Sequence, residues 1–99
     1  MDLPTSSLFS MSLTMTDNLA KRLIEYDLPF YECNIHCYTN AAKYGSSSNV
    51  DAVINAGDVV WFTNGNLRDF MFMNNVAGSN TKIVCTATVP TYYMKQLLK

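Results

Sequence analysis

The chain has little charge. Charged residues make up 15% of its 99 residues, below the roughly 25% typical of soluble domains, and only two are glutamates, Glu25 and Glu32. The net charge is −1, and Lys21-Arg22 is the only adjacent basic pair. Phosphate contacts dominate the affinity of proteins for nucleic acids. We therefore expect no nucleic-acid partner.

Glycine and long apolar runs are also scarce. The four glycines are isolated from one another, so neither G-x-G-x-x-G nor a P-loop occurs, and we expect no nucleotide or other cofactor. No apolar run approaches the length of a membrane span, and no basic residue precedes an apolar run in the first sixteen residues. Three cysteines, an odd number, are best interpreted as reduced thiols. The sequence thus predicts a cytoplasmic protein without membrane contact.

Neutral polar and apolar residues fill the chain instead. At 48% hydrophobic residues it can bury the core of a single domain over residues 1–99, with residues 1–7 as a flexible lead-in. Ten asparagines supply a neutral surface, and six tyrosines with six methionines enrich residue types that interface cores favour. The asparagine and methionine counts also fit an A/T-rich coding sequence, as in many small viral or mobile-element proteins.

Three stretches alternate between apolar and polar residues. The alternation runs through residues 9–16, 31–38 and 83–89. A period of two is typical of a strand with one face on the core and the other toward solvent. It predicts strands at 9–16, 30–39 and 82–89, in a sheet covered on one side only.

A fourth strand is expected at 58–63. Its apolar run Val59-Val60-Trp61-Phe62 predicts burial on both faces, so Trp61 is interpreted as a core residue.

Three further segments carry helix signals. Thr16 and Asp17 offer capping chemistry for a helix over 17–28, which the following proline ends. Residues 48–57 have the spacing of a short capped helix with a stop at Gly57, and residues 90–99 indicate a C-terminal helix.

The dipeptide Asn64-Gly65 leaves the next segment open. Asn-Gly between apolar runs favours a hairpin, but a two-residue turn would place Val60 opposite Asp69, which is a poor pair. A helix over 66–77 puts Asp69 at the acidic cap position, with a stop at the following glycine. We favour the helix and keep the hairpin as the alternative.

These elements predict an α+β protein. Apart from the short inserted helix and the C-terminal helix, their order is βαββαβ, the ferredoxin-like arrangement. It is a two-layer sandwich in which helices cover mainly one face of a four-stranded mixed or antiparallel sheet. The alternative is a small three-layer α/β sheet, whose strands should be apolar throughout.

The segment Tyr31–Tyr38 gathers the only histidine and two cysteines, which suggests a metal site at first sight. In a strand, Cys33 and Cys37 lie about 13 Å apart, too far to share one ion or a disulfide. We therefore predict no metal site and place all three cysteines, including Cys85, in the core.

Two sets of residues remain as candidates for binding a partner. The first is the polar face of two strands, which the alternation turns away from the core: Ser10, Ser12, Thr14, Glu32, Asn34, His36 and Tyr38. The second is the apolar run 70–73, which exceeds the stripe that a helix needs and so offers Phe70, Phe72 and Met73.

From these features we predict a small non-enzymatic regulator or inhibitor that docks on a larger protein. A homo-oligomer and a viral or mobile-element origin are compatible with the same features. No catalytic residues are assigned. One alternative is a small enzyme that uses His36 as a general base. Another is a module that binds single-stranded RNA on an open sheet face.

Overall fold

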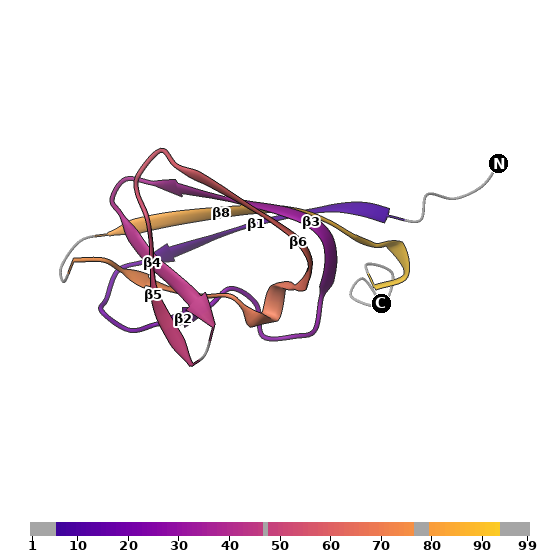
Figure 1. The fold of residues 1–99 in the computed structure, drawn as a ribbon, viewed down its shortest axis with the longest axis horizontal. Coiled ribbons are helices and arrows are strands. Elements are labelled where there is room, and N and C mark those ends of the chain that lie inside the picture. Colours follow the sequence, from indigo (N-terminus) through magenta and orange to yellow (C-terminus); the bar gives the residue numbers. More distant parts are fainter. Residues whose placement is uncertain (1–5, 47, 77–79, 94–99) are drawn as a thin grey trace.

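The computed structural model describes residues 6–46, 48–76 and 80–93, which form two four-stranded antiparallel sheets (Figure 1). The first sheet has the order β1-β8-β3-β6 and the second has the order β2-β7-β4-β5. In the first sheet the bounds are β1 (Ser6–Met15), β8 (Thr81–Pro90), β3 (Pro29–Tyr38) and β6 (Val59–Asn66). In the second they are β2 (Lys21–Arg22), β7 (Met71–Asn74), β4 (Ala42–Ser46) and β5 (Asn49–Ile54).

The core lies between the two sheets, and alternation decides which side chains enter it. In β1 the odd residues, such as Met11 and Met15, pack on the core, whereas the serines and threonines between them are exposed. β3 and β8 follow the same rule, with Ile35 and Ile83 fully enclosed. The strands predicted at 9–16, 30–39 and 82–89 are confirmed. The faces that they bury are confirmed as well, except at the start of β3, where Tyr31 is exposed and Phe30 is buried instead.

β6 confirms the strand predicted at 58–63 but not its double burial. Val60 and Phe62 pack on the core, while the indole of Trp61 is 68% exposed and Val59 also lies on the outside. The placement of Trp61 in the core was wrong. β6 is an edge strand whose outer side no other element covers among the described residues, so two apolar residues remain in solvent.

The helix predicted over 17–28 is absent. Asp17 does cap a turn, since its carboxylate accepts a hydrogen bond from Leu19 N and pairs with Lys21 at 3.1 Å. The chain then pairs with β7 through the two residues of β2 and buries Leu23 and Leu28 in irregular backbone. Burial against the second sheet overrides the helical spacing, because most helix stability in proteins comes from tertiary packing.

The short helix predicted over 48–57 is also wrong, because this segment is β5 followed by a turn. Ile54 enters the core while its neighbour Val53 is exposed, as alternation in a strand requires. Gly57 does stop the element, at a positive φ of 90°. Its turn is held by a hydrogen bond from Gly57 N to Cys37 O.

Neither interpretation of the segment after Asn64-Gly65 was right. Both residues lie within β6, where Gly65 faces Phe30. A single 3-10 turn, η1 (Leu67–Asp69), follows, and β7 then replaces the rest of the helix expected over 66–77. Residue 77 lies outside the described residues. The cap itself was real, because Asn66 Oδ1 accepts from Arg68 N.

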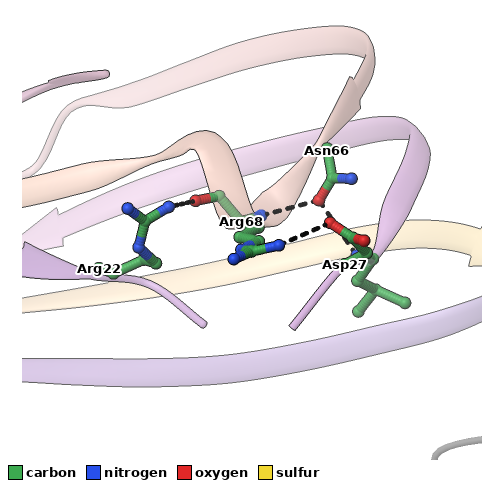
Figure 2. Close-up of polar contacts among 5 residues, drawn as sticks. Arg22, Asp27, Asn66 and Arg68 are labelled. Atoms are coloured by element: carbon green, nitrogen blue, oxygen red, sulfur yellow. Dashed lines mark hydrogen bonds and ion pairs between the residues drawn. The ribbon is translucent and has the colours of Figure 1, made fainter. Parts of the chain in front are cut away.

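The same Asn66 Oδ1 also accepts from Leu28 N and so ties η1 to the start of β3 (Figure 2). Arg22 Nη1 donates to Arg68 O at 2.7 Å, and Arg68 pairs with Asp27 at 3.2 Å. The irregular segment before β3 is therefore fastened to η1 by polar contacts, not by helical hydrogen bonds.

At the ends of the chain, Ser6 and Ser7, expected in the lead-in, already belong to β1. Residues 91–93 are helical, while 1–5 and 94–99, and with them most of the predicted C-terminal helix, lie outside the described residues. Within the described part, no helix is long and apolar enough to cross a membrane.

The predicted ferredoxin-like α+β fold, and its three-layer α/β alternative, are wrong. The chain builds two facing sheets because it crosses between them in most of its connections: β1, β3, β6 and β8 lie in one sheet, and β2, β4, β5 and β7 in the other. Segments with helix-like spacing become strands of the second sheet.

Candidate functional site

The outward side of β1, β8, β3 and β6, here called the outer face, carries both predicted polar rows. Ser10, Ser12 and Thr14 are exposed along β1, and Glu32, Asn34, His36 and Tyr38 follow one another along β3. The two rows are not neighbours, because β8 lies between them. Its Thr86 and Thr88 join the rows into one continuous surface.

Register arranges the outer face into rows that cross the strands. One row runs Ser10, Thr86, Asn34, Trp61, and the row beside it runs Leu8, Thr88, Glu32, Thr63. Directly opposed residues in neighbouring strands lie about 4.5–5.5 Å apart, so side chains within a row are in contact range. The indole of Trp61 thus stands beside the Asn34 amide.

These two rows enclose a shallow pocket of about 130 Å³, here called the Trp61 pocket. Its lining residues are Leu8, Glu32, Cys33, Asn34, Trp61, Thr86, Ala87 and Thr88. The Oδ1 atom of Asn34 is shielded from solvent and has no hydrogen-bond partner among the residues that the structure describes. A shielded carbonyl oxygen without a donor is uncommon in folded proteins and needs an explanation.

His36 lies two residues further along β3, outside this pocket. Its ring stacks on Tyr38 with centroids 6.1 Å apart, and its register neighbours are Val59 and Val84. No carboxylate stands opposite it in the sheet. The fold therefore places no partner carboxylate opposite His36 in the sheet, and its role as a general base stays a prediction.

The three cysteines are buried as free thiols between the sheets, as predicted. A hydrogen bond between the thiols of Cys33 and Cys85 lowers the pKa of Cys33 and raises that of Cys85. Burial raises the pKa of Cys37, whose thiol donates to Asn40 O. The raised pKa values of Cys37 and Cys85 hold these two thiols in the protonated, unreactive form that suits core packing.

A second pocket, of about 210 Å³, opens beside η1 and is here called the phenylalanine pocket. Its lining residues are Phe30, Gly45, Ser46, Phe62, Thr63, Gly65, Asn66, Asp69 and Phe70. The rings of Phe62 and Phe70 meet edge to face at 4.9 Å, and Phe30 stacks on Phe70 at 6.0 Å.

Two glycines shape this second pocket. A Cβ at Gly65 would stand 2.8 Å from Cζ of Phe30, so the missing side chain lets that ring lie against β6. At Gly45 a Cβ would collide with the backbone carbonyl of Asn49, where the pairing of β4 with β5 shifts register. Both positions require glycine for close approach.

The predicted apolar candidates divide between core and pocket. Phe72 is 0% exposed and belongs to the core, so it is no part of a surface patch. Met73 is half-buried in β7, and Phe70 forms one wall of the phenylalanine pocket. The structure therefore gives Phe70 a place at a candidate site and removes Phe72 from one.

A metal centre does not fit these residues. Among the described residues, no group of three or more histidine, cysteine, aspartate or glutamate side chains could hold an ion. The space between the sheets is lined by apolar side chains and thiols, and the only histidine points to the outer face.

No protein-family model matches the chain, and no curated protein sequence matches it. Solved structures do match its fold. A cupin 2 conserved barrel domain protein from Salinispora arenicola superposes with a TM-score of 0.59 and 13% identity, over 88% of this chain and 69% of the other.

A de novo designed double-stranded β-helix matches with a TM-score of 0.51 and 11% identity, over 80% of this chain and 97% of the design. The fold is a double-stranded β-helix. The polyketide cyclase RemF from Streptomyces resistomycificus has it too, with a TM-score of 0.56 and 8% identity, over 82% of this chain and 54% of the cyclase.

These likenesses overturn the predicted function. The docking regulator or inhibitor rested on the low charge, the many tyrosine, methionine and phenylalanine residues and the lack of a catalytic constellation, and the viral origin rested on the asparagine and methionine counts. The double-stranded β-helix is instead shared with a cupin barrel domain protein and with a polyketide cyclase, which is an enzyme. The enzyme alternative agrees better with these neighbours, although its proposed residue, His36, lies outside both pockets.

Sequence reasoning missed the residues that complete both pockets. The alternation in 83–89 already turned Thr86 and Thr88 outward, but nothing in it placed β8 between β1 and β3. The exposure of Trp61 was missed because its neighbours in the sequence are apolar. The phenylalanine pocket was missed because it joins residues of β3, β4, β6 and η1 that carry no common motif.

Proposed function

We propose that the protein binds a small, mostly apolar ring-shaped molecule in the phenylalanine pocket. The observation that carries the proposal is the aromatic lining: three phenylalanine rings meet at a pocket that opens to solvent. Pockets lined by apolar and aromatic side chains with a few polar groups are typical small-molecule sites.

Size and polarity narrow the class of ligand. About 210 Å³ is below the roughly 300–1,000 Å³ of pockets for drug-sized molecules, so a single ring with short substituents fits best. Polar groups gather at the rim in Thr63, Asn66 and Asp69. Asn66 Oδ1 already accepts two hydrogen bonds.

The carboxylate of Asp69 is available to accept a hydrogen bond from the ligand, because Asp69 has no hydrogen bond or ion pair within the described part of the chain. It accepts a hydrogen bond from a hydroxyl or amine on the ring. The proposed ligand therefore has an apolar ring and one donor group.

Toluene and p-cresol test the proposal, since they share a ring and differ by one hydroxyl. We expect both to shift the backbone amide signals of Gly45, Thr63 and Gly65 in a saturable way in nuclear magnetic resonance titrations. Asp69→Asn should weaken p-cresol about fivefold, the equivalent of about 1 kcal/mol, because the asparagine oxygen still accepts a hydrogen bond but has lost the charge. The binding of toluene should be unchanged.

Phe70→Ala should weaken both ligands, because it removes a wall of the pocket. Phe70→Leu keeps an apolar side chain there and guards against loss of the fold. Val53→Thr, an exposed position of β5 outside the pocket, is the control and should bind like the parent. Amide shifts that avoid the pocket, or equal binding by Phe70→Ala, would refute the proposal.

A further inference from the structure

The outer face presents an indole to solvent. Trp61 is 68% exposed and Leu8, at the other end of the same pocket, is 69% exposed. Tryptophan is mostly buried in folded proteins, and exposed apolar groups rimmed by polar residues mark binding sites. The flat ring of Trp61 offers an apolar platform at the edge of the sheet.

Beside this platform stand hydrogen-bonding groups that lack partners. Asn34, directly opposite Trp61 in the register, has a shielded Oδ1 without a donor. Glu32, one outward position before it, contributes a carboxylate to the same pocket. The Glu32 carboxylate and Asn34 Oδ1 accept, and Asn34 Nδ2 donates, so a molecule that binds here must bring donors for the two acceptors. Thr86 and Thr88 contribute hydroxyls, which can donate and accept.

Charge limits the class of ligand further. Glu32 is the only charged residue that lines the Trp61 pocket, and Lys82 lies two cross-strand rows away from Asn34. A phosphate or a nucleic acid would meet a carboxylate and no nearby cation. A ligand with an apolar face, many hydroxyl donors and no negative charge agrees with every group in the pocket.

We propose that the Trp61 pocket binds a saccharide. A pyranose ring has an apolar face of C–H groups, which lies on the indole, and hydroxyls at its edge, which reach Asn34, Glu32 and Thr86. A pocket of about 130 Å³ has room for one sugar ring. This site is independent of the phenylalanine pocket, since the two share no lining residue.

Trp61 is the only tryptophan of the chain, so its fluorescence reports this pocket alone. The probes are glucose, galactose, mannose and N-acetylglucosamine, each titrated alone, followed by maltopentaose, cellopentaose and chitopentaose. We expect at least one monosaccharide to change the emission with a Kd of roughly 1–10 mM, as its small number of atoms allows. A pentasaccharide that binds more tightly identifies a glycan chain as the ligand, and equal binding identifies a free sugar or a chain end.

Asn34→Ala should weaken the best sugar at least about fivefold, and Thr86→Val, which keeps the shape of the side chain, should weaken it as well. Thr14→Val is the matched control, because it makes the same change on the same face outside the pocket. Thermal unfolding of each variant verifies that it is folded.

Three outcomes would overturn the proposal. The first is that none of the sugars changes the emission. The second is a response to choline and not to sugars, which would identify a cation on the indole beside Glu32. The third is an emission maximum that moves to shorter wavelength with protein concentration alone, which would show that a second copy covers the face.

Discussion

At the scale of single residues, the cysteines show how position in a strand decides chemistry. Cys33 and Cys37 are four residues apart in one strand and point to the same side, into the core. The spacing that excluded a shared metal ion also placed both thiols in the core, where burial raises the pKa of Cys37. Period-two reasoning predicted this correctly, because it depends only on the strand itself.

The raised pKa of Cys37 makes stability depend on pH. The unfolded chain loses the thiol proton near its ordinary value of 9.0, and the folded chain loses it only at higher pH. The stability that Cys37 contributes is therefore complete below that value and is lost as the pH rises through and beyond it. We expect the urea midpoint to fall between about pH 7 and about pH 10, and to fall less in Cys37→Ala. An equal fall in both proteins would contradict this assignment.

The outer face gives the opposite lesson at the same scale. Trp61 sits in an uninterrupted apolar run that reads as a buried strand, yet every second residue of that run lies outside. An apolar run cannot tell a central strand from an edge strand with an open face. Only the order of strands in the sheet decides it.

At the scale of elements, caps were easier to predict than the elements that they cap. Asp17, Gly57 and Asn66 were all chosen for helix ends, and each one makes a turn in the structure. The preference of these residues for turns depends only on their own side chain or backbone, so it holds whether or not a helix follows. The helices failed because their apolar residues, among them Leu23 and Ile54, are better buried in the core between the two sheets.

Asn66 is the element-scale feature most open to measurement. Its Oδ1 accepts from Leu28 N at 3.1 Å and Arg68 N at 3.0 Å, joining β3 to η1. Asn66→Ala should lower the free energy of unfolding by about 1–2 kcal/mol, since a lost cap and an unpaired backbone donor act together. Chemical denaturation measures the loss. Asn49→Ala, an exposed asparagine of β5, is the control, and a loss of the same size there would contradict the role of Asn66.

At the scale of the whole molecule, the order of the strands in the two sheets could not be predicted from the sequence. Met11 pairs with Cys85, and Cys33 pairs with Phe62 and Ala87, so the first sheet is built almost wholly from distant pairs. Alternation fixes which face of a strand is buried but says nothing about its neighbour. The outer rows were therefore predicted, whereas the two pockets that depend on neighbouring strands were not.

The strand order also predicts how stability is distributed. β8 and β3 are paired on both sides, while β5 lies at an edge and β2 has two residues. We expect amide hydrogens of β8 and β3 to exchange with solvent most slowly and those of β2 and β5 fastest, because interior strands open only with the sheet. Hydrogen exchange followed by mass spectrometry measures this. Protection in β5 equal to that in β8 would show that the second sheet continues beyond its edge strand, through contacts with another molecule.

The central place of β8 has a consequence for how the chain reaches this structure. β1 precedes the other described strands in the chain, and its one partner among them is β8 (residues 81–90), which the ribosome makes after all of them. Until β8 has been made, the edge of β3 with which β8 will pair has no partner strand either. The first sheet closes by inserting its last strand in chain order between its first two strands. Native pairing therefore waits until β8 has been made, and we expect it to be slow, as long-range β pairing is.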